Sequence, residues 1–464
     1  MKNAKYIQNV QLLFALGLTV LFSACDSFVE VDLPSSQLTS ATVFDEKATA
    51  NAAMTDIYSK LRDNGLLTGT ASGMSAALGA YADELTYYGV STGATQFFYS
   101  NSVLPANPTV AGWWSFSYNQ IYAANSVYEG VNASTKLSQA DKDQLMGEAL
   151  FVRAVVHFYL VNVFGDVPYI TTTNYEQNQD VQRMTTAAVY ARIIFDLETA
   201  QQLLPSDYFG GQRIRPNKLV TTALLARVYL YNGNNAEAAN AASAVINETG
   251  TYSLEPDFDL AFLKDSPSTI WQLIPQMEGR NTNEGATFIF NAGPPTYAAL
   301  RSEFVAAFES GDLRRTHWVR TITNGSNTWY HTFKYKQRGM TGTTQEYSIV
   351  LRLPEMYLIR AEARIKQGEL TNGKDDLNVI RNLAGLDDTT AISQQDLLNA
   401  VFDERSMELF TECGHRFFDL KRAGVINTVL SVSKPGWNSH EVLLPLPETE
   451  LLLNPNLAPQ NPGY

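Results

Sequence analysis

The chain has 464 residues, of which 45% are hydrophobic and only 17% charged, with a net charge of -13. The apolar content excludes a wholly disordered chain, and no apolar run is long enough for a multi-pass membrane protein. The acidic surplus makes nucleic-acid binding unfavourable, because phosphate backbones are repelled. The weakly charged surface suits neutral ligands. The two cysteines, Cys25 and Cys413, fit no zinc motif and no disulfide framework.

The N-terminus has the pattern of a bacterial lipoprotein signal. Lys2 and Lys5 precede an apolar stretch over 10–22, which is too short to span a bilayer stably. Residues 21–25 (LFSAC) then resemble a lipobox. We therefore expect a signal peptide over 1–24, acylation of Cys25 as the first mature residue, and an extended tether over 25–40. An ordinary secretory signal with a chance cysteine is the alternative.

Helical periodicity dominates the remainder. Apolar residues recur every three or four positions between 145 and 163, which predicts a helix. Ser138 and Ser393 each stand three residues before an aspartate, as helix N-caps do. His157 lies inside the first of these helices and is expected to be a core histidine. Further helices are predicted over 42–63, 113–131, 186–203 and 298–309.

Two segments share one spacing of small and turn residues. Its members lie at offsets 0, 3, 7 and 12: Ala226, Tyr229, Gly233 and Ala238, then Ala361, Arg364, Gly368 and Gly373. This spacing is typical of tetratricopeptide-like helical hairpins, in which small residues let two antiparallel helices approach closely. Two generic hairpins remain an alternative. The stretches 65–112, 165–184, 250–297 and 320–348 are expected to be long loops, and the proline-rich end 435–464 a packed, non-helical strap.

Catalytic motifs are weak. Gly89–Gly93 has the nucleophile-elbow spelling but lacks the strand and helix that the motif requires. The segment 368–374 has P-loop spacing, but Asp375 replaces the hydroxyl residue that holds magnesium. The histidines form no ligand pair, and no metal-binding cluster emerges. The sequence therefore predicts a protein that is not an enzyme and has no cofactor; it identifies no calcium site.

Aromatic residues are concentrated near one predicted loop. Eleven of the 42 residues between Tyr81 and Tyr122 are aromatic, against 11% overall. Flat aromatic faces with polar neighbours suit the C–H faces and hydroxyl rims of sugars. Most of these rings are expected to be structural, and only one of the two adjacent tryptophans is expected to reach a ligand. The candidate ligand-binding residues are Trp113 or Trp114 as a stacking platform, Tyr88, Tyr297 and Trp329 as flanking faces, and Asp83 and Asn101 as hydroxyl partners.

Several longer strings resemble the SusD/RagB family of nutrient-binding outer-membrane lipoproteins over nearly the whole mature chain. The strings that carry the resemblance, after the lipobox, are 149–154 (ALFVRA), 158–169 (FYLVNVFGDVPY), 223–230 (ALLARVYL), 351–363 (LRLPEMYLIRAEA), 404–405 (ER), 408–409 (EL), 417–422 (FFDLKR) and 454–464 (NPNLAPQNPGY). One departure is Cys413, which stands where the family usually has glycine.

The resemblance implies a mostly α fold, in which tetratricopeptide-like hairpins form a right-handed superhelical scaffold with long loops and a few short strands on one side. It implies one SusD-like domain over 41–464, with an N-terminal part over 41–260 and a C-terminal part over 261–464. It further implies a lipid-anchored protein on the outer face of the outer membrane, which binds oligosaccharide or polysaccharide and delivers it to a SusC-like, TonB-dependent transporter.

Other functions stay open at this stage. The same scaffold could bind peptide or another nutrient. A surface glycosidase or a pure tetratricopeptide adaptor would also be compatible with a helical chain of this composition.

Overall fold

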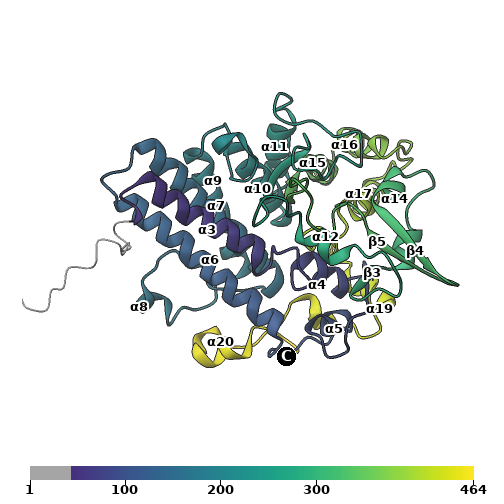
Figure 1. Cartoon of the computed structure of the whole chain (residues 1–464), viewed down its shortest axis with the longest axis horizontal. Coiled ribbons are helices and arrows are strands. Elements are labelled where there is room, and N and C mark those ends of the chain that lie inside the picture. Colours follow the sequence, from purple (N-terminus) through teal and green to yellow (C-terminus); the bar gives the residue numbers. More distant parts are fainter. Residues whose placement is uncertain (1–42) are drawn as a thin grey trace, which may run out of the picture. The chain divides into compact units, whose positions relative to one another are not determined.

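Long, closely packed helices form one side of the structure (Figure 1). The computed structural model describes residues 43–464, of which 44–464 cluster as one unit. The predicted signal peptide, Cys25 and the tether lie outside the described residues. The helices of the N-terminal half are α3 (Lys47–Asp63), α6 (Pro108–Ala133), α7 (Gln139–Phe164) and α9 (Thr186–Leu203). Neighbours in this series pack against each other, with α7 in contact with α3, α6 and α9.

Helix α7 is buried almost all around. Ser138 accepts a hydrogen bond from the backbone N–H of Asp141, which confirms the predicted N-cap. The helix is long and apolar enough to cross a membrane, but 94% of its most apolar window is buried inside the protein. It is therefore the central helix of a globular core. His157 on this helix is fully buried with its Nδ1 2.8 Å from the Arg153 carbonyl oxygen, as expected of a core histidine.

Both predicted hairpins are present. They are α10 (Lys218–Tyr231) with α11 (Asn235–Ile246), and α15 (Leu353–Lys366) with α16 (Leu370–Leu383). Gly233 and Gly368 turn the chain at φ +81° and +86°, which favours glycine. A Cβ on Gly373 would lie only 2.8 Å from the Ala361 carbonyl oxygen. The small residues of the repeat are thus needed where the two helices cross.

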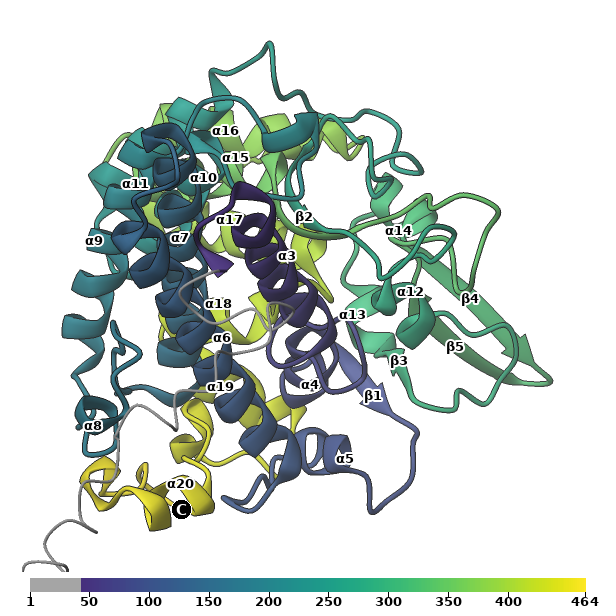
Figure 2. The ribbon, with the colours of Figure 1, turned by 60° about the vertical axis from the view of Figure 1, so that its left-hand side comes forward.

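Short strands gather on the side opposite α9 and α11 (Figure 2). A four-stranded antiparallel sheet has the order β1-β3-β5-β4, formed by β1 (Leu85–Tyr87), β3 (Ala298–Leu300), β4 (Val319–Asn324) and β5 (Asn327–Thr332). Leu300 pairs with Leu85 on one side and with Tyr330 on the other. A second sheet pairs β2 (Thr269–Leu273) with β6 (Ser348–Arg352).

Several sequence expectations are corrected here. The helix predicted over 298–309 is wrong in its first part, because Ala298–Leu300 pair in the sheet and only Ser302–Ala306 (α13) are helical. The expected loops and strap also contain regular structure. Their helices are α4 (Met74–Tyr81), α5 (Ala94–Tyr99), α8 (Tyr175–Asn178), α12 (Asn283–Phe288) and α20 (Glu448–Leu453). The remaining helices are α14 (Leu313–His317), α17 (Gln394–Leu409), α18 (His415–Arg422) and α19 (Ile426–Ser433).

Buried ion pairs join neighbouring helices, and they involve residues of the sequence strings that resemble the SusD/RagB family. Arg227 on α10 makes a bidentate pair with Glu355 on α15, at 2.7 and 2.6 Å, and both side chains are 1% exposed. Arg153 on α7 pairs in the same way with Asp196 on α9, at 2.6 and 2.7 Å. Arg153, Arg227 and Glu355 lie in the strings 149–154, 223–230 and 351–363, whereas Asp196 lies outside them. The strings therefore describe the scaffold that holds neighbouring helices together.

Cys413 occupies a strained turn. Its φ of +44° lies in the left-handed region, and it directly precedes Gly414 at φ +72°. A non-glycine residue is disfavoured in this region by roughly 1 kcal/mol. Burial raises the pKa of the Cys413 thiol to about 12. This thiol is therefore protonated at neutral pH, and Cys413 serves as a packed structural residue.

Candidate functional site

Trp113 and Trp114 are core residues. They are 1% and 3% exposed. The Trp113 indole N–H donates to the Ser72 carbonyl oxygen at 2.7 Å, and its ring lies 5.3 Å from that of Phe98. The Trp114 ring packs on Phe164, with centroids 5.3 Å apart. Neither indole is open to a ligand, so the predicted stacking platform is wrong: both rings point into the core, whereas Ser115 and Phe116 occupy the exposed face of α6.

Asn101 is also turned inward. It is 3% exposed with φ +52°, and its side-chain amide donates to the Tyr81 carbonyl oxygen at 3.0 Å. It braces the turn after α5. The prediction of Asn101 as a surface partner for ligand hydroxyls is therefore wrong in this structure.

The other predicted aromatics lie along the four-stranded sheet. Tyr88 is 40% exposed just after β1, and its backbone N–H donates to the Tyr297 carbonyl oxygen at 2.7 Å. The Tyr297 hydroxyl donates to the Ala71 carbonyl oxygen, and its ring meets that of Tyr87 edge to face at 5.6 Å. The Tyr297 ring is thus fixed in place just before β3, and the Tyr88 backbone is held beside it at the end of β1.

Trp329 on β5 is partly buried and its ring covers Gly293, where an added Cβ would collide with it. Gly293 is four residues before Tyr297, a span of at most ~14 Å in extended chain. The loop 293–297 therefore links Trp329 to the tyrosines at a distance that several linked sugar units can bridge. We call Tyr87, Tyr88, Tyr297 and Trp329 the aromatic ridge.

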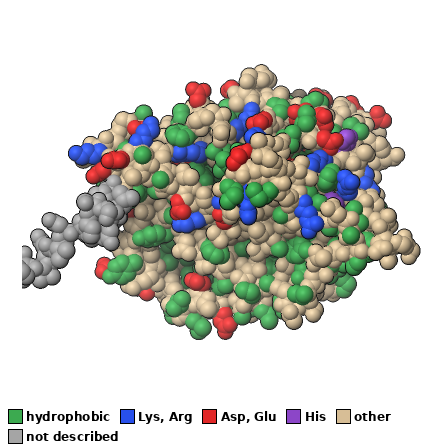
Figure 3. Space-filling view, in the orientation of Figure 1, with side chains coloured by type: hydrophobic (Ala, Val, Ile, Leu, Met, Phe, Trp, Pro, Cys, Tyr) green, Lys and Arg blue, Asp and Glu red, His purple; other side chains and the backbone are tan. Residues whose placement is uncertain are grey.

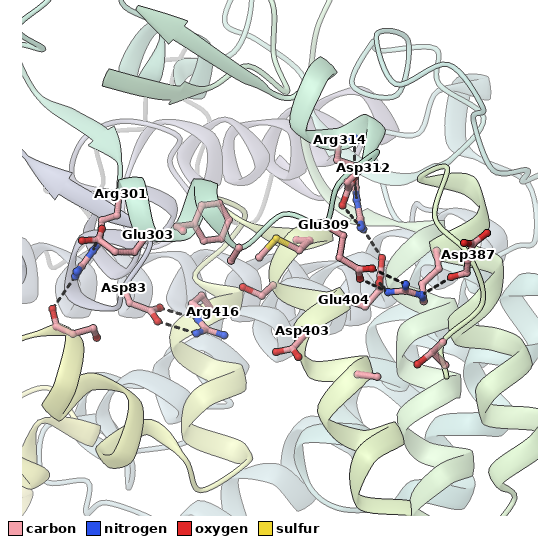
Figure 4. Close-up of a pocket in the computed structure, with 18 of the residues that line it drawn as sticks. Asp83, Arg301, Glu303, Glu309, Asp312, Arg314, Asp387, Asp403, Glu404 and Arg416 are labelled. Atoms are coloured by element: carbon pink, nitrogen blue, oxygen red, sulfur yellow. Dashed lines mark hydrogen bonds and ion pairs between the residues drawn. The ribbon is translucent and has the colours of Figure 1, made fainter. Parts of the chain in front are cut away.

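A cleft of about 930 Å³ lies at the opposite end of β1 and β3 (Figure 4). Asp83 precedes β1 and Arg301 follows β3, so the same two strands supply the ridge at one end and the cleft at the other. The remaining walls come from α13, the turn before α14, the end of α16, the loop 387–390, α17, α18 and the end of α19. Its charged residues are Asp83, Arg301, Glu303, Glu309, Asp312, Arg314, Arg381, Asp387, Asp388, Asp403, Glu404 and Arg416.

Asp83 is held inside this cleft by Arg416. The guanidinium Nε and Nη2 each donate to one carboxylate oxygen at 2.8 Å. Burial alone would raise the pKa of Asp83, but the hydrogen bonds and charge of Arg416 outweigh it and lower that pKa. The predicted hydroxyl partner is therefore an ionised carboxylate whose best acceptor positions are already occupied.

The sequence did not reveal the cleft. Its residues come from segments as far apart as 83 and 433, and no spacing rule links them. Within residues 43–464, no group of three or more His, Cys, Asp or Glu is arranged to hold a metal ion. The face seen in Figure 3 carries scattered charges among uncharged polar and hydrophobic groups, in keeping with the low charged fraction of the chain.

Comparison with known proteins identifies the family. A family profile described as starch-binding, associating with outer membrane, matches residues 31–230, and the SusD family profile matches residues 313–464. The chain belongs to the SusD family. As a SusD-like protein it is non-catalytic, as predicted, and the resemblance drawn from the sequence strings is confirmed. The family description also places these proteins in association with the outer membrane.

Individual relatives agree with this assignment. SusD-like protein P2 of Formosa agariphila is 29% identical over 77% of this chain and 81% of its own length. A SusD superfamily protein of Bacteroides vulgatus has a TM-score of 0.79 at 21% identity, over 90% of this chain and 99% of the other. A SusD-like carbohydrate binding protein of Bacteroides fragilis has a TM-score of 0.77 at 18% identity, over 90% and 100%. At these identities the two structures establish the mostly helical SusD-like fold alone.

Proposed function

We propose that this SusD-like protein binds an oligosaccharide or polysaccharide on the aromatic ridge and delivers it to a SusC-like, TonB-dependent transporter. The observation that carries the proposal is the ridge itself, on a chain of a family described as starch-binding. Three of its rings, those of Tyr88, Tyr297 and Trp329, were expected to form sugar-binding faces. Tyrosine and tryptophan supply a flat apolar face and a polar edge at little entropic cost.

The fixed geometry of the ridge supports a role in recognition. The Tyr297 hydroxyl donates to the Ala71 carbonyl oxygen, and the Trp329 ring packs on Gly293. For Tyr88, the backbone N–H donates to the Tyr297 carbonyl oxygen, which fixes its main chain. Rings that are ordered before binding lose little freedom when a ligand arrives, so more of the contact energy appears as affinity.

The test is affinity electrophoresis of the purified protein against a panel of polysaccharides. We expect retardation by at least one neutral glycan, and a loss of roughly tenfold or more in affinity, about 1.4 kcal/mol, for Trp329→Ala and for Tyr88→Ala. Tyr122→Ala is the matched control, because Tyr122 is 54% exposed on α6, away from the ridge. Equal retardation of all variants, or no retardation by any glycan, would contradict the proposal.

We also propose that the chain is held at the outer membrane, facing the exterior, by acylation of Cys25 after removal of residues 1–24. Residues 25–40 then serve as the tether and 41–464 act as one SusD-like domain. One acyl chain gives marginal binding, and two or more anchor a protein stably. Metabolic labelling with palmitate should mark the wild type and not Cys25→Ala, and pull-down of the labelled protein should recover the transporter. An unlabelled wild type that remains at the cell surface would overturn the anchor.

A further inference from the structure

The charges of the cleft do not balance internally. Each of its four arginines already has a carboxylate: Arg301 with Glu303, Arg314 with Asp312 and Glu404, Arg381 with Glu309 and Glu404, and Arg416 with Asp83. Asp387, Asp388 and Asp403 have no cationic partner within the described chain, and Arg381 reaches only the backbone carbonyl oxygen of Asp387, at 3.0 Å (Figure 4). The loop 387–388 and the facing wall of α17 are therefore left with surplus negative charge.

A mostly buried serine, whose hydroxyl is accessible from the cleft, lies on the same wall. Ser406 follows Asp403 by three residues, so the two side chains share one face of α17. Ser406 lines the cleft, is only 9% exposed, and makes no side-chain hydrogen bond within residues 43–464. Its hydroxyl is therefore available to a ligand in the cleft. Ala400, one turn before Asp403, leaves open space beside them.

The Asp403 carboxyl lies in a setting that disfavours its negative charge. Desolvation at the cleft wall raises the pKa of its carboxyl and the nearby Glu309 charge adds to the increase, although Arg416 opposes it. A positive group placed here would stabilise the ionised carboxylate. Thr389 and Thr390 also line the cleft, and the Thr389 hydroxyl oxygen accepts a hydrogen bond from the Ala391 backbone N–H at 3.3 Å.

We propose that this cleft is a second binding site, separate from the aromatic ridge, for an amine-bearing saccharide unit with a free ammonium group, such as glucosamine. The ammonium donates charge-assisted hydrogen bonds to Asp403, and the unpaired charges of Asp387 and Asp388 add to the attraction of a cation into the cleft. Ring hydroxyls donate to and accept from Ser406 and the two threonines. The volume is within the range of small-ligand sites.

The composition of the walls separates this ligand from others. The one aromatic lining residue, Phe304, is 7% exposed, so a neutral sugar finds no stacking face here and is better served by the ridge. Glycans that carry carboxylate or sulfate are repelled by the surplus acids. A saccharide unit is favoured over an aliphatic amine because the hydroxyl-rich wall and Ser406 need polar ring partners.

The test compares glucosamine tetramer with its fully N-acetylated form by isothermal titration calorimetry on the purified protein. We expect the free-amine tetramer to bind at least tenfold more tightly than the acetylated one, and its affinity to fall as ionic strength rises. Asp403→Asn should lower that affinity at least tenfold and Ser406→Ala several-fold. Asp207→Asn is the matched control, because Asp207 is exposed on a loop outside the cleft and should change nothing.

Two further measurements make the outcome decisive. Asp403→Asn should lower the affinity for the free-amine tetramer by the same factor in the wild type and in a Trp329→Ala background, which separates this site from the proposed function of the ridge. Equal binding of the two tetramers, or full affinity in Asp403→Asn, overturns the cleft site. Equal binding of a lysine tripeptide overturns the saccharide assignment.

Discussion

Truncating Trp113 distinguishes a core residue from a ligand platform. Trp113→Ala removes a fully buried indole, its edge contact with Phe98 and its hydrogen bond to Ser72. Buried Trp→Ala substitutions cost about 3–5 kcal/mol, which includes the cavity left behind. The orphaned Ser72 carbonyl oxygen contributes to this, since a net hydrogen bond is worth about 1 kcal/mol. Because native domains are stable by only about 5–15 kcal/mol, the loss is a large part of the total.

The assay is denaturant unfolding followed by circular dichroism, with glycan affinity measured on the same variant below its unfolding range. We expect a large fall in the unfolding midpoint for Trp113→Ala and little change for the exposed Tyr122→Ala. Affinity of the still-folded Trp113→Ala protein should fall far less than that of Trp329→Ala. A small loss of glycan affinity is expected in Trp113→Ala, because Ser72 is next to Ala71, whose carbonyl oxygen accepts the hydrogen bond from Tyr297.

One result would refute this reasoning. If the free energy of unfolding of Trp113→Ala is within about 1 kcal/mol of the wild-type value but the variant no longer binds glycan, the indole contacts the ligand and the core assignment fails.

Three further predictions concern the scaffold. Arg227→Met leaves Glu355 buried and unpaired and should cost about 3–5 kcal/mol, whereas the double variant with Glu355→Met should recover much of it; a double variant as unstable as the single one would contradict this. Burial, with the neighbouring Asp83 charge, raises the pKa of Glu84 to about 8 in the folded protein, so the folded state holds a proton that the unfolded state has lost between about pH 4.5 and 8. The stability that Glu84 contributes to the wild type therefore falls as pH rises through this window. Glu84→Gln does not titrate, so its unfolding midpoint minus that of the wild type should be larger at pH 8 than at pH 5. The same difference at both pH values would contradict this. Ser393→Ala removes the N-cap of α17 and should lower the unfolding free energy by about 0.5–2 kcal/mol, and an unchanged midpoint would show that the cap is not needed.

Local signals were enough to predict much of the helical scaffold. The helix over 186–203, both serine caps and the two hairpin turns at Gly233 and Gly368 match the structure. The β4–β5 hairpin was missed, although Gly325-Ser326, between the paired residues Asn324 and Asn327, is a typical two-residue turn signal.

The ligand-facing surface was predicted less well for a physical reason. Aromatic density indicated the right region, but not which ring faces point outward. Trp113, Trp114 and Asn101 are covered by elements distant in sequence, and Tyr88, Tyr297 and Trp329 remain on the sheet. Sequence alone cannot assign such faces, because exposure depends on which segments pack on top.

The sequence by itself determined the family, the helical hairpins and the absence of catalytic motifs, since these depend on local spacing and on the buried pairs that join neighbouring helices. Only the tertiary structure decided that Asp403, Ser406 and the loop 387–390 line one cleft, and that the acidic charges of this cleft remain unbalanced. Charge pairing inside a cleft is a property of side chains that converge from separate segments, and no pattern along one segment encodes it.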